Sequence, residues 1–347
     1  MSSPRRGRPA RTALPTVSLG STRMRITRIG FGAWALGGGD WQFGWGPQDD
    51  AASIVAIRHA LELGVNWIDT AAVYGLGHSE EVVARALKDL PPGKRPYVFT
   101  KCGNVWDERD RAAPLRRVGD PKSVRREIEG SLRRLGVERI DLYQMHWPAE
   151  DGTDLEDYWG TLLDLKAEGK ARAVGLSNHD DAQLVVAERI GHVDTLQPPF
   201  SAINRRAASS DLPWCLVHGT GVIVYSPMQS GLLSGSFSAE RAARLDPSDW
   251  RSRVPAFTGD ALKRNLALAQ ALRPIARRHD CSVGAVAVAW TLAWPGVTGA
   301  IVGARSPEQV DGWHAAATLE LTPADLDEIA AAIERTGAGS GPTRPRR

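Results

Sequence analysis

Four ionisable side chains of types that move protons fall at the ends of predicted strands or in the loops after them. They are Asp69, Tyr74, Lys101 and His146. Three of them end a predicted strand, and Tyr74 follows Asp69 by five residues in the next loop. Because polar residues at the carboxyl ends of barrel strands gather at one face, we expect the four side chains to lie close together.

This combination suits a phenol that donates a proton to a carbonyl group. The pKa of a free tyrosine is about 10, which is high for a proton donor at neutral pH. The Lys101 cation would lower the pKa of Tyr74 by favouring the phenolate, and Asp69 would keep Lys101 charged. His146 would orient the carbonyl group by a hydrogen bond. The hydride that the carbonyl carbon also needs would come from a nicotinamide cofactor, since no side chain supplies one.

Each of the four residues also has an ordinary structural interpretation. Asp69 alone is typical of a capping residue, and Tyr74 alone of an aromatic side chain packed in a loop. Lys101 and His146 fit a buried ion-pair partner and a core histidine. Their joint occurrence at three successive strand ends favours a site. A Schiff-base role for Lys101 is a further alternative, which the neighbouring Asp69 disfavours because it keeps the amine protonated.

The elements that must position these residues alternate between short apolar runs and helical patterns, which predicts βαβ units and a parallel sheet. Strands are predicted over residues 28–33, 66–69, 97–101, 140–146, 172–177, 195–197, 222–225 and 298–302. Eight strands separated mostly by helices favour a closed (β/α)8 TIM barrel, an α/β fold, over an open sheet. A β-hairpin over residues 17–27 would cover the barrel's bottom. The poorly periodic stretch 226–260 predicts a long functional loop at the carboxyl-terminal face.

Two helix starts are predicted from their capping residues. Asp50 is expected to cap a helix that ends at Gly64. Asp120 followed by Pro121 predicts the start of a second helix, which Gly136 ends.

Composition and charge indicate a globular body with basic ends. The chain has 347 residues, of which 42% are hydrophobic and 24% charged, as is ordinary for a globular protein. We expect a disordered basic arm over 1–15, a barrel domain over 16–335 and a disordered tail over 336–347. The two ends carry seven arginines, and removing these from the net charge of +3 leaves −4 for the rest. A slightly acidic body of this kind argues against a nucleic-acid partner.

Cysteine usage and apolar segments predict a cytoplasmic protein without a membrane span. Cys102, Cys215 and Cys281 form no CxxC pair, so neither a disulfide framework nor a cysteine zinc site is expected. The eight histidines show no HExxH spacing, and no metal is expected. No apolar segment follows the arginine pair at 5–6 as an export signal requires. Residues 282–304 are uncharged, but Pro295 interrupts them, which predicts a buried helix, a turn and a strand.

Six segments resemble those of one enzyme family and occur in the same order. They are GVNWIDTAAVYG (64–75), VFTKCG (98–103), DLYQMHWP (141–148), GKARAVGLSN (169–178), YSPMQSGLLSG (225–235) and IVGARSPEQV (301–310). The chain resembles the aldo-keto reductase superfamily over roughly residues 17–335. Within it, the chain is most similar to the bacterial general-stress-type branch and less so to the potassium channel β subunits.

The resemblance implies that Asp69, Tyr74, Lys101 and His146 are a catalytic tetrad, and that NADP(H) lies extended across the barrel mouth. The nicotinamide end would be held by Ser177, Asn178 and Gln197 at the carboxamide and by Tyr225 stacked on the ring. The pyrophosphate would pass near Ser226, Met228, Ser230 and Leu232. The adenosine ribose would be surrounded by Gly303, Ala304, Arg305 and Gln309.

The adenosine end contains the residue that would select the cofactor and one departure from the family pattern. Arg305 is the candidate for a 2′-phosphate, because a guanidinium matches phosphate geometry, and this favours NADPH. Family members often carry Asn where this chain has Trp313. Adenine stacking on this indole and an indole packed in the core are both open alternatives.

Tryptophans in loops and strand ends predict an aromatic, mostly apolar substrate pocket. The candidates are Trp34, Trp45, Trp106 and Trp147. Each fits core packing equally well, but together they favour aliphatic or aromatic aldehydes and ketones, including sugar-derived ones. An alternative function is an NADP(H)-binding regulatory module that senses redox state with little turnover. The sequence leaves open whether the chain is a monomer or a homo-oligomer.

Overall fold

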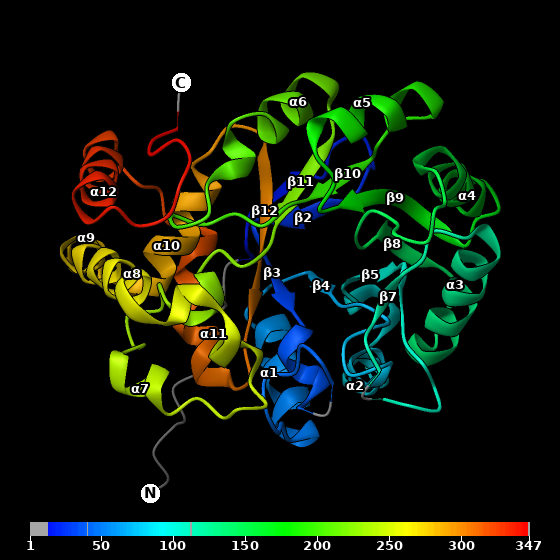
Figure 1. The fold of residues 1–347 in the computed structure, drawn as a ribbon, viewed down its shortest axis with the longest axis horizontal. Coiled ribbons are helices and arrows are strands. Elements are labelled where there is room, and N and C mark those ends of the chain that lie inside the picture. Colours follow the sequence, from blue (N-terminus) through cyan, green and yellow to red (C-terminus); the bar gives the residue numbers. More distant parts are fainter. Residues whose placement is uncertain (1–12, 40, 112, 346–347) are drawn as a thin grey trace, which may run out of the picture.

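A computed structural model describes residues 13–39, 41–111 and 113–345. Eight parallel strands close into a barrel, and helices surround it (Figure 1). In barrel order these strands are β3 (Ile29–Gly32), β4 (Trp67–Asp69), β5 (Tyr97–Cys102), β8 (Ile140–Met145), β9 (Ala171–Ser177), β10 (Thr195–Gln197), β11 (Gly221–Val224) and β12 (Val297–Gly303). β12 pairs with β3 and completes the circle. The predicted (β/α)8 fold is confirmed, and each predicted strand overlaps an observed one.

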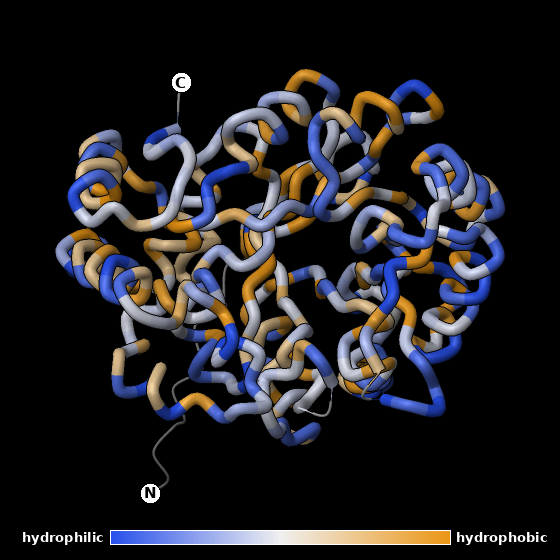
Figure 2. The backbone as a smooth tube through the Cα atoms, viewed as in Figure 1, coloured by the Kyte–Doolittle hydropathy of each residue, from blue (hydrophilic) through white to orange (hydrophobic). Residues whose placement is uncertain are grey.

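The helices of the described residues form the outer layer. They are α1 (Asp50–Glu62), α2 (His78–Leu87), α3 (Pro121–Leu135), α4 (Leu155–Ala167), α5 (Asp181–Ile190), α6 (Asp211–His218), α7 (Ala239–Ala243), α8 (Gly259–Ala271), α9 (Arg273–Arg278), α10 (Val283–Leu292), α11 (Pro307–His314) and α12 (Pro323–Thr336). Figure 2 shows hydrophobic residues on the central strands, and hydrophobic and hydrophilic residues interspersed along the outer helices. Amphipathic helices that bury one face against a parallel sheet give this pattern.

One of the two predicted helix starts is correct, and the other is displaced by one residue. The Asp120 side chain accepts from the Ser123 amide at 2.8 Å, Pro121 opens α3, and Gly136 ends it in a left-handed conformation. The cap of α1 is Asp49, whose side chain accepts from the Ala52 amide at 2.7 Å. The prediction of Asp50 as the cap is therefore wrong. Two adjacent aspartates look alike in sequence, and only the extended backbone of Asp49 distinguishes them.

A β-hairpin closes the bottom of the barrel, as predicted. β1 (Thr16–Ser18) and β2 (Arg25–Thr27) pair antiparallel. Leu19, Met24 and Ile26 of this region belong to one buried cluster with the barrel-interior residues. The Trp67 indole is fully buried in this interior, and a Cβ at Gly30 would lie 2.2 Å from it. Glycine at position 30 is therefore required by the close approach.

Strand alternation divides the barrel interior into an apolar lower part and a polar upper part. Successive side chains point to opposite faces, so residues two apart share the interior. Trp67 is followed by Asp69 and Phe99 by Lys101, and all four are buried. The polar member of each pair lies nearer the carboxyl end of its strand, which places the ionisable groups at the mouth.

The segment 226–260 forms a long ordered loop, which begins after β11 and is tied to the loop after β3. It contains α7 and short 3-10 turns at Gln229–Gly231, Trp250–Arg253 and Pro255–Phe257. The Trp250 amide donates to the Gly44 carbonyl at 3.2 Å, and the Arg253 guanidinium donates to the Gln42 carbonyl at 2.8 Å. These contacts join two loops at the carboxyl-terminal face.

The segment after α12, where the sequence predicts a disordered tail from 336, packs against the residues after β10. Ala338 is buried, and the Arg205 guanidinium donates to its carbonyl at 3.0 Å. The Ser340 amide donates to the Ile203 carbonyl at 3.2 Å. Gly339 has a φ of +63°, and a Cβ there would lie 1.7 Å from the Ile203 carbonyl oxygen. Residues 1–12 of the predicted arm lie outside the described residues.

Residues 282–304 form the predicted helix, turn and strand, namely α10, a turn and β12. None of the helices within residues 13–345 that the structure describes has both the length and the apolar character to cross a membrane. Cys102 and Cys215 are buried free thiols, and Cys281 is a half-buried one.

Candidate active site

Three of the four predicted catalytic side chains form one buried cluster at the barrel mouth. The Lys101 ammonium lies 2.6 Å from Oδ1 of Asp69 and donates to the Thr70 carbonyl at 2.8 Å. The same ammonium lies 3.5 Å from the Tyr74 hydroxyl. Lys101 is 1% exposed, Asp69 3% and Tyr74 9%, so water is largely excluded from the cluster.

The loop after β4 places Tyr74 over Lys101. β4 and β5 are adjacent parallel strands, which puts their carboxyl ends side by side. The Tyr74 amide donates to the Ala71 carbonyl at 3.1 Å, and the Ser79 amide donates back to the Tyr74 carbonyl at 3.1 Å. Gly75 has a φ of +63°, and a Cβ there would lie 2.3 Å from the Gly37 carbonyl oxygen. The turn therefore needs glycine beside the predicted proton donor.

Burial dominates the protonation equilibria of this cluster. It raises the pKa of Asp69 and lowers that of Lys101, and the attraction between the two groups opposes both shifts. The pKa of Tyr74 is raised well above 10 by burial and by the nearby carboxylate of Asp69. The net direction is opposite to the lowering expected from Lys101, because burial outweighs the effect of the neighbouring cation. The Lys101 ammonium is hydrogen-bonded to Asp69, and the Tyr74 phenol stays protonated at neutral pH.

His146 follows β8 and lies beside Tyr74. The two rings meet edge to face, with centroids 5.6 Å apart. Burial, together with Lys101 and Arg117, holds the pKa of His146 well below its usual range. A neutral imidazole results, which offers a hydrogen-bond donor without a full charge.

The residues predicted at the nicotinamide end form one hydrogen-bonded network. The Gln197 amide donates to Oδ2 of Asp69 at 2.9 Å, which joins this network to the ionisable cluster. The Ser177 hydroxyl donates to the Gln197 carbonyl at 2.9 Å. The Tyr225 hydroxyl donates to Oδ1 of Asn178 at 2.7 Å, and the Asn178 amide donates to the His146 carbonyl at 2.9 Å.

The predicted pyrophosphate segment has an unusual backbone and uneven exposure. Ser226, Gln229 and Ser230 all have positive φ, between 47° and 55°. Leu232 is fully buried and Met228 packs against the core, so their side chains face the protein interior. Ser226 and Ser230 are the half-buried hydroxyl side chains of this segment.

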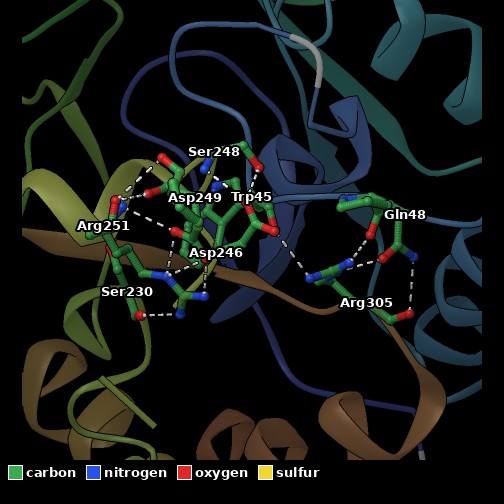
Figure 3. Close-up of polar contacts among 11 residues, drawn as sticks. Trp45, Gln48, Ser230, Asp246, Ser248, Asp249, Arg251 and Arg305 are labelled. Carbon is green, nitrogen blue, oxygen red and sulfur yellow. Dashed lines mark hydrogen bonds and ion pairs between the residues drawn. The ribbon is translucent and has the colours of Figure 1, made fainter. Parts of the chain in front are cut away.

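Arg305 lies at the predicted adenosine end. Within the described residues, the hydrogen bonds of its guanidinium all go to neutral oxygen atoms. Its Nε donates to the Gln48 side chain at 2.5 Å, and other nitrogens donate to the carbonyls of Trp45 at 3.3 Å and Pro47 (Figure 3). The Gln309 side chain accepts from the Arg305 amide at 2.8 Å. No carboxylate is hydrogen-bonded to this half-buried guanidinium in the part of the chain that the structure describes, although the charge of Asp249 acts on it from a greater distance.

The other residues predicted at the adenosine end divide between surface and core. Gly303 is exposed where β12 ends, and Ala304 is buried. Trp313 is 1% exposed and belongs to the hydrophobic core. Of the two alternatives for Trp313, the structure therefore has the core-facing one, and its indole offers no open face for stacking.

An aromatic wall surrounds Tyr74. Trp34 stacks on the Tyr74 ring at 6.1 Å and on Trp250 at 5.1 Å, and Trp45 meets Trp34 edge to face at 5.3 Å. Trp106 packs against the same cluster. The remaining predicted pocket residue, Trp147, has the Arg117 guanidinium 4.4 Å above its ring, and the recorded ring contacts do not join it to Tyr74.

Two residues of the long loop were missed in the sequence. Trp250 belongs to the aromatic wall, and Arg251 pairs with Asp249, with 2.6 Å between Nη2 and Oδ2 (Figure 3). Arg251 also donates to the Ser230 carbonyl at 3.2 Å and lies 4.6 Å from the Trp45 ring centroid. The length of the loop signalled a role at the mouth, but no pattern within it showed which residues reach inward.

The residues present fit a nicotinamide dinucleotide. Amide and hydroxyl groups meet beside the proton-donor cluster, and the Tyr225 ring is half-buried at the upper end of the barrel interior. Arg305 precedes the amino terminus of α11, whose dipole and free amides favour phosphate. Within the described part of the chain, no three His, Cys, Asp or Glu side chains are grouped as a metal site requires.

Comparisons with known proteins agree with this geometry. The model of the Aldo/keto reductase family matches residues 28–334. The NADH-specific methylglyoxal reductase of Escherichia coli K12 is 34% identical over 92% of this chain and 99% of its own length. The aldo-keto reductase YhdN of Bacillus subtilis is 34% identical over 92% and 93%. The solved glycerol dehydrogenase of Gluconobacter oxydans superposes with a TM-score of 0.84 at 34% identity, over 96% of this chain and 99% of that one.

Proposed function

Because the chain belongs to the aldo/keto reductase family, we propose that it reduces aldehydes and ketones to alcohols with NADP(H) and uses Tyr74 as the proton donor. The observation that carries this proposal is the buried contact of 3.5 Å between the Lys101 ammonium and the Tyr74 hydroxyl. It places a protonated phenol next to a cation at the mouth of a barrel, where family members use a nicotinamide cofactor.

The protein's own groups would divide the proton chemistry among them. Tyr74 donates its proton to the carbonyl oxygen, and Lys101 stabilises the phenolate that this leaves. Asp69 keeps the ammonium in place, since it holds Lys101 at 2.6 Å. His146, neutral and beside the Tyr74 ring, donates a hydrogen bond that orients the substrate oxygen.

The cofactor supplies the hydride when it is bound. Ser177, Asn178 and Gln197 would hold its carboxamide, and Tyr225 would support the ring. Ser226, Ser230 and the neighbouring backbone would face the pyrophosphate. Gly303, Arg305 and Gln309 would surround the adenosine ribose. The hydrogen bonds that join the nicotinamide-end residues to Asp69, and the place of Arg305 before α11, support this assignment.

Preference for NADPH over NADH rests on Arg305. Its neutral partners leave its charge available to a 2′-phosphate, and its planar fork matches that group. The Escherichia coli relative carries the name of an NADH-specific enzyme, so the family alone does not fix the preference. Steady-state kcat/KM with both cofactors tests the proposal directly, and a higher value with NADH would reject it.

The substrate class that fits the mouth is small to medium, uncharged carbonyl compounds. Trp34, Trp45, Trp106 and Trp250 supply an aromatic lining around Tyr74. Relatives named for methylglyoxal and glycerol act on compounds with few carbon atoms, which supports short substrates. We also place the protein in the cytoplasm, in the general-stress-type branch. Its free thiols support a reducing compartment.

A carbonyl panel followed at the NADPH absorbance band tests the function. Methylglyoxal, short aliphatic aldehydes and aromatic aldehydes are each supplied with NADPH and, separately, with NADH. Multiple turnovers with at least one carbonyl are expected. Tight cofactor binding without multiple turnover would reject the reductase proposal and favour the regulatory module.

A further inference from the structure

His179 is a buried histidine outside the four residues assigned to proton chemistry. It follows β9 by two residues and is 1% exposed. Its Nδ1 lies 2.8 Å from the Ser177 carbonyl oxygen, and its Nε2 lies 2.8 Å from the Tyr158 hydroxyl. Both ring nitrogens therefore have a partner.

These two partners determine where the imidazole proton lies. A carbonyl oxygen only accepts, so Nδ1 must carry the proton that reaches Ser177. Nε2 is then the acceptor, and the Tyr158 hydroxyl donates to it. Burial lowers the pKa of His179 to about 4, against smaller opposing effects of the Ser177 carbonyl and Asp180, so the ring is neutral at neutral pH. A neutral ring has the one donor and one acceptor that this geometry needs.

The bond from His179 holds one side of a single peptide unit, and Gln197 holds the other. The Ser177 carbonyl and the Asn178 amide belong to the same planar unit and point in opposite directions. His179 donates to the carbonyl, and the Asn178 amide donates to the Gln197 carbonyl at 3.2 Å. Asn178 has a φ of +61°, a conformation that costs free energy for a residue other than glycine. The two bonds stabilise this turn.

The orientation of that peptide unit decides what the Asn178 side chain reaches. Its amide donates to the His146 carbonyl at 2.9 Å and its Oδ1 accepts from Tyr225 at 2.7 Å. A rotation of the unit would withdraw Asn178 from both contacts. His146 and Tyr225 lie on either side of the mouth, at the ends of β8 and β11, so the effect would reach both.

We propose that His179, supported by Tyr158, is a positioning residue that holds the Ser177–Asn178 turn and thereby His146 and Tyr225 in the geometry of the active mouth. The consequence for turnover rests on the proposed reductase function, whereas the hydrogen-bond assignment does not. His179 touches none of the reacting groups and acts through Asn178.

The variants separate a directional hydrogen bond from simple space filling. His179→Phe keeps an aromatic ring but removes both bonds. His179→Asn offers an amide nitrogen where Nδ1 lies and keeps the bond to Ser177. Tyr158→Phe removes only the supporting hydroxyl. His218→Phe is the matched control, because His218 is bonded to the Trp214 carbonyl in α6 and is not part of the mouth.

The expected results follow from the loss of alignment. His179→Phe should lower kcat by about tenfold or more, since misplacement of roughly 1 Å is enough for such losses. In this variant, the backbone amide hydrogen of Asn178 should exchange with solvent faster than in the wild type. His179→Asn should recover most of both properties, Tyr158→Phe should show a smaller loss, and His218→Phe should show none. A folded His179→Phe variant with wild-type kcat and wild-type exchange, or equal losses in the Phe and Asn variants, would overturn the proposal.

Nitrogen-15 NMR of the wild-type protein tests the assignment without any variant or turnover. The His179 proton should be on Nδ1 at neutral pH, and a proton on Nε2 would overturn the proposal. Absence of turnover in the wild type would reject the reductase function, while the NMR and exchange results would still decide the role of His179 in holding the turn.

Discussion

The Lys101 ammonium lies 3.5 Å from the Tyr74 hydroxyl, while the same ammonium lies closer to its carboxylate partner. This relationship indicates a phenol that keeps its proton until a substrate carbonyl accepts it. Lysine then acts chiefly on the product of proton transfer, where a phenolate would attract it more strongly than the neutral phenol does.

Replacement of the phenol tests this division of roles. Tyr74→Phe should lower kcat for carbonyl reduction by about 10²–10⁴-fold, because only the proton donor is removed. Affinity for NADPH, measured by fluorescence titration, should stay close to the wild-type value. A variant with near-normal turnover would remove Tyr74 from the acid role.

The pH profile of reduction follows from the raised pKa of Tyr74. Burial and Asp69 move that pKa well above 10, so the donor remains protonated through neutral and mildly alkaline pH. We expect kcat for reduction to stay level from about pH 6 to pH 9, since the protonated form is the active one. The test applies when the chemical step limits kcat. A decline of kcat at the alkaline end of that range would then show that the phenol is more acidic than the structure indicates.

Arg305 should control the choice of cofactor. Arg305→Ala should reduce kcat/KM with NADPH by roughly 10- to 100-fold, because a charge-assisted hydrogen bond contributes about 1.5–3 kcal/mol. The value with NADH should change little. Arg305→Lys keeps the charge but not the planar fork, so its kcat/KM with NADPH should lie between those of the wild type and Arg305→Ala. Equal losses with both cofactors would instead indicate that Arg305 supports the Gln48 loop.

Trp250 should limit substrate width. Trp250→Ala opens the side of the aromatic wall that stacks on Trp34, so bulky aromatic aldehydes should show a lower KM while methylglyoxal kinetics change little. Trp214→Ala in α6 serves as a control for loss of a tryptophan elsewhere. Unchanged KM values across the panel would place Trp250 outside the substrate path.

Glu127 should make stability depend on pH. Its carboxylate accepts from the Gly103 amide at 2.9 Å, and burial raises the pKa of Glu127 to about 7. The folded protein therefore binds more protons than the unfolded chain between pH 4.5 and about 7, and the free energy of unfolding falls as the pH rises through that interval.

Glu127→Gln removes this titration while retaining an acceptor for the Gly103 amide. The variant should be more stable than the wild type by about 1–3 kcal/mol at alkaline pH, with the difference vanishing near the unfolded pKa. Urea unfolding at several pH values measures it. Glu129→Gln, on the same helix but more exposed, is the control for the loss of a carboxylate. The prediction would be contradicted if the free energy of unfolding changed with pH in the same way for Glu127→Gln and the wild type.

The sequence determined the alternation of strands and helices, because apolar periodicity and turn residues act locally. Asp120, Pro121 and Gly136 mark the ends of α3 by their own backbone preferences, without help from the rest of the chain. The positions of Asp69, Lys101 and His146 at successive strand ends likewise followed from where the short apolar runs end. Six motifs then connected that order to a family.

Tertiary structure alone decided what depends on packing between distant segments. The pKa of Tyr74 is set by burial that a sequence does not display, and the direction expected from Lys101 was reversed by it. Trp250 reaches the mouth because the long loop is bonded to Gly44, which is remote in sequence. The order after α12 depends on Gly339 fitting against Ile203. In each case the deciding free energy comes from contacts between segments that local patterns leave unspecified.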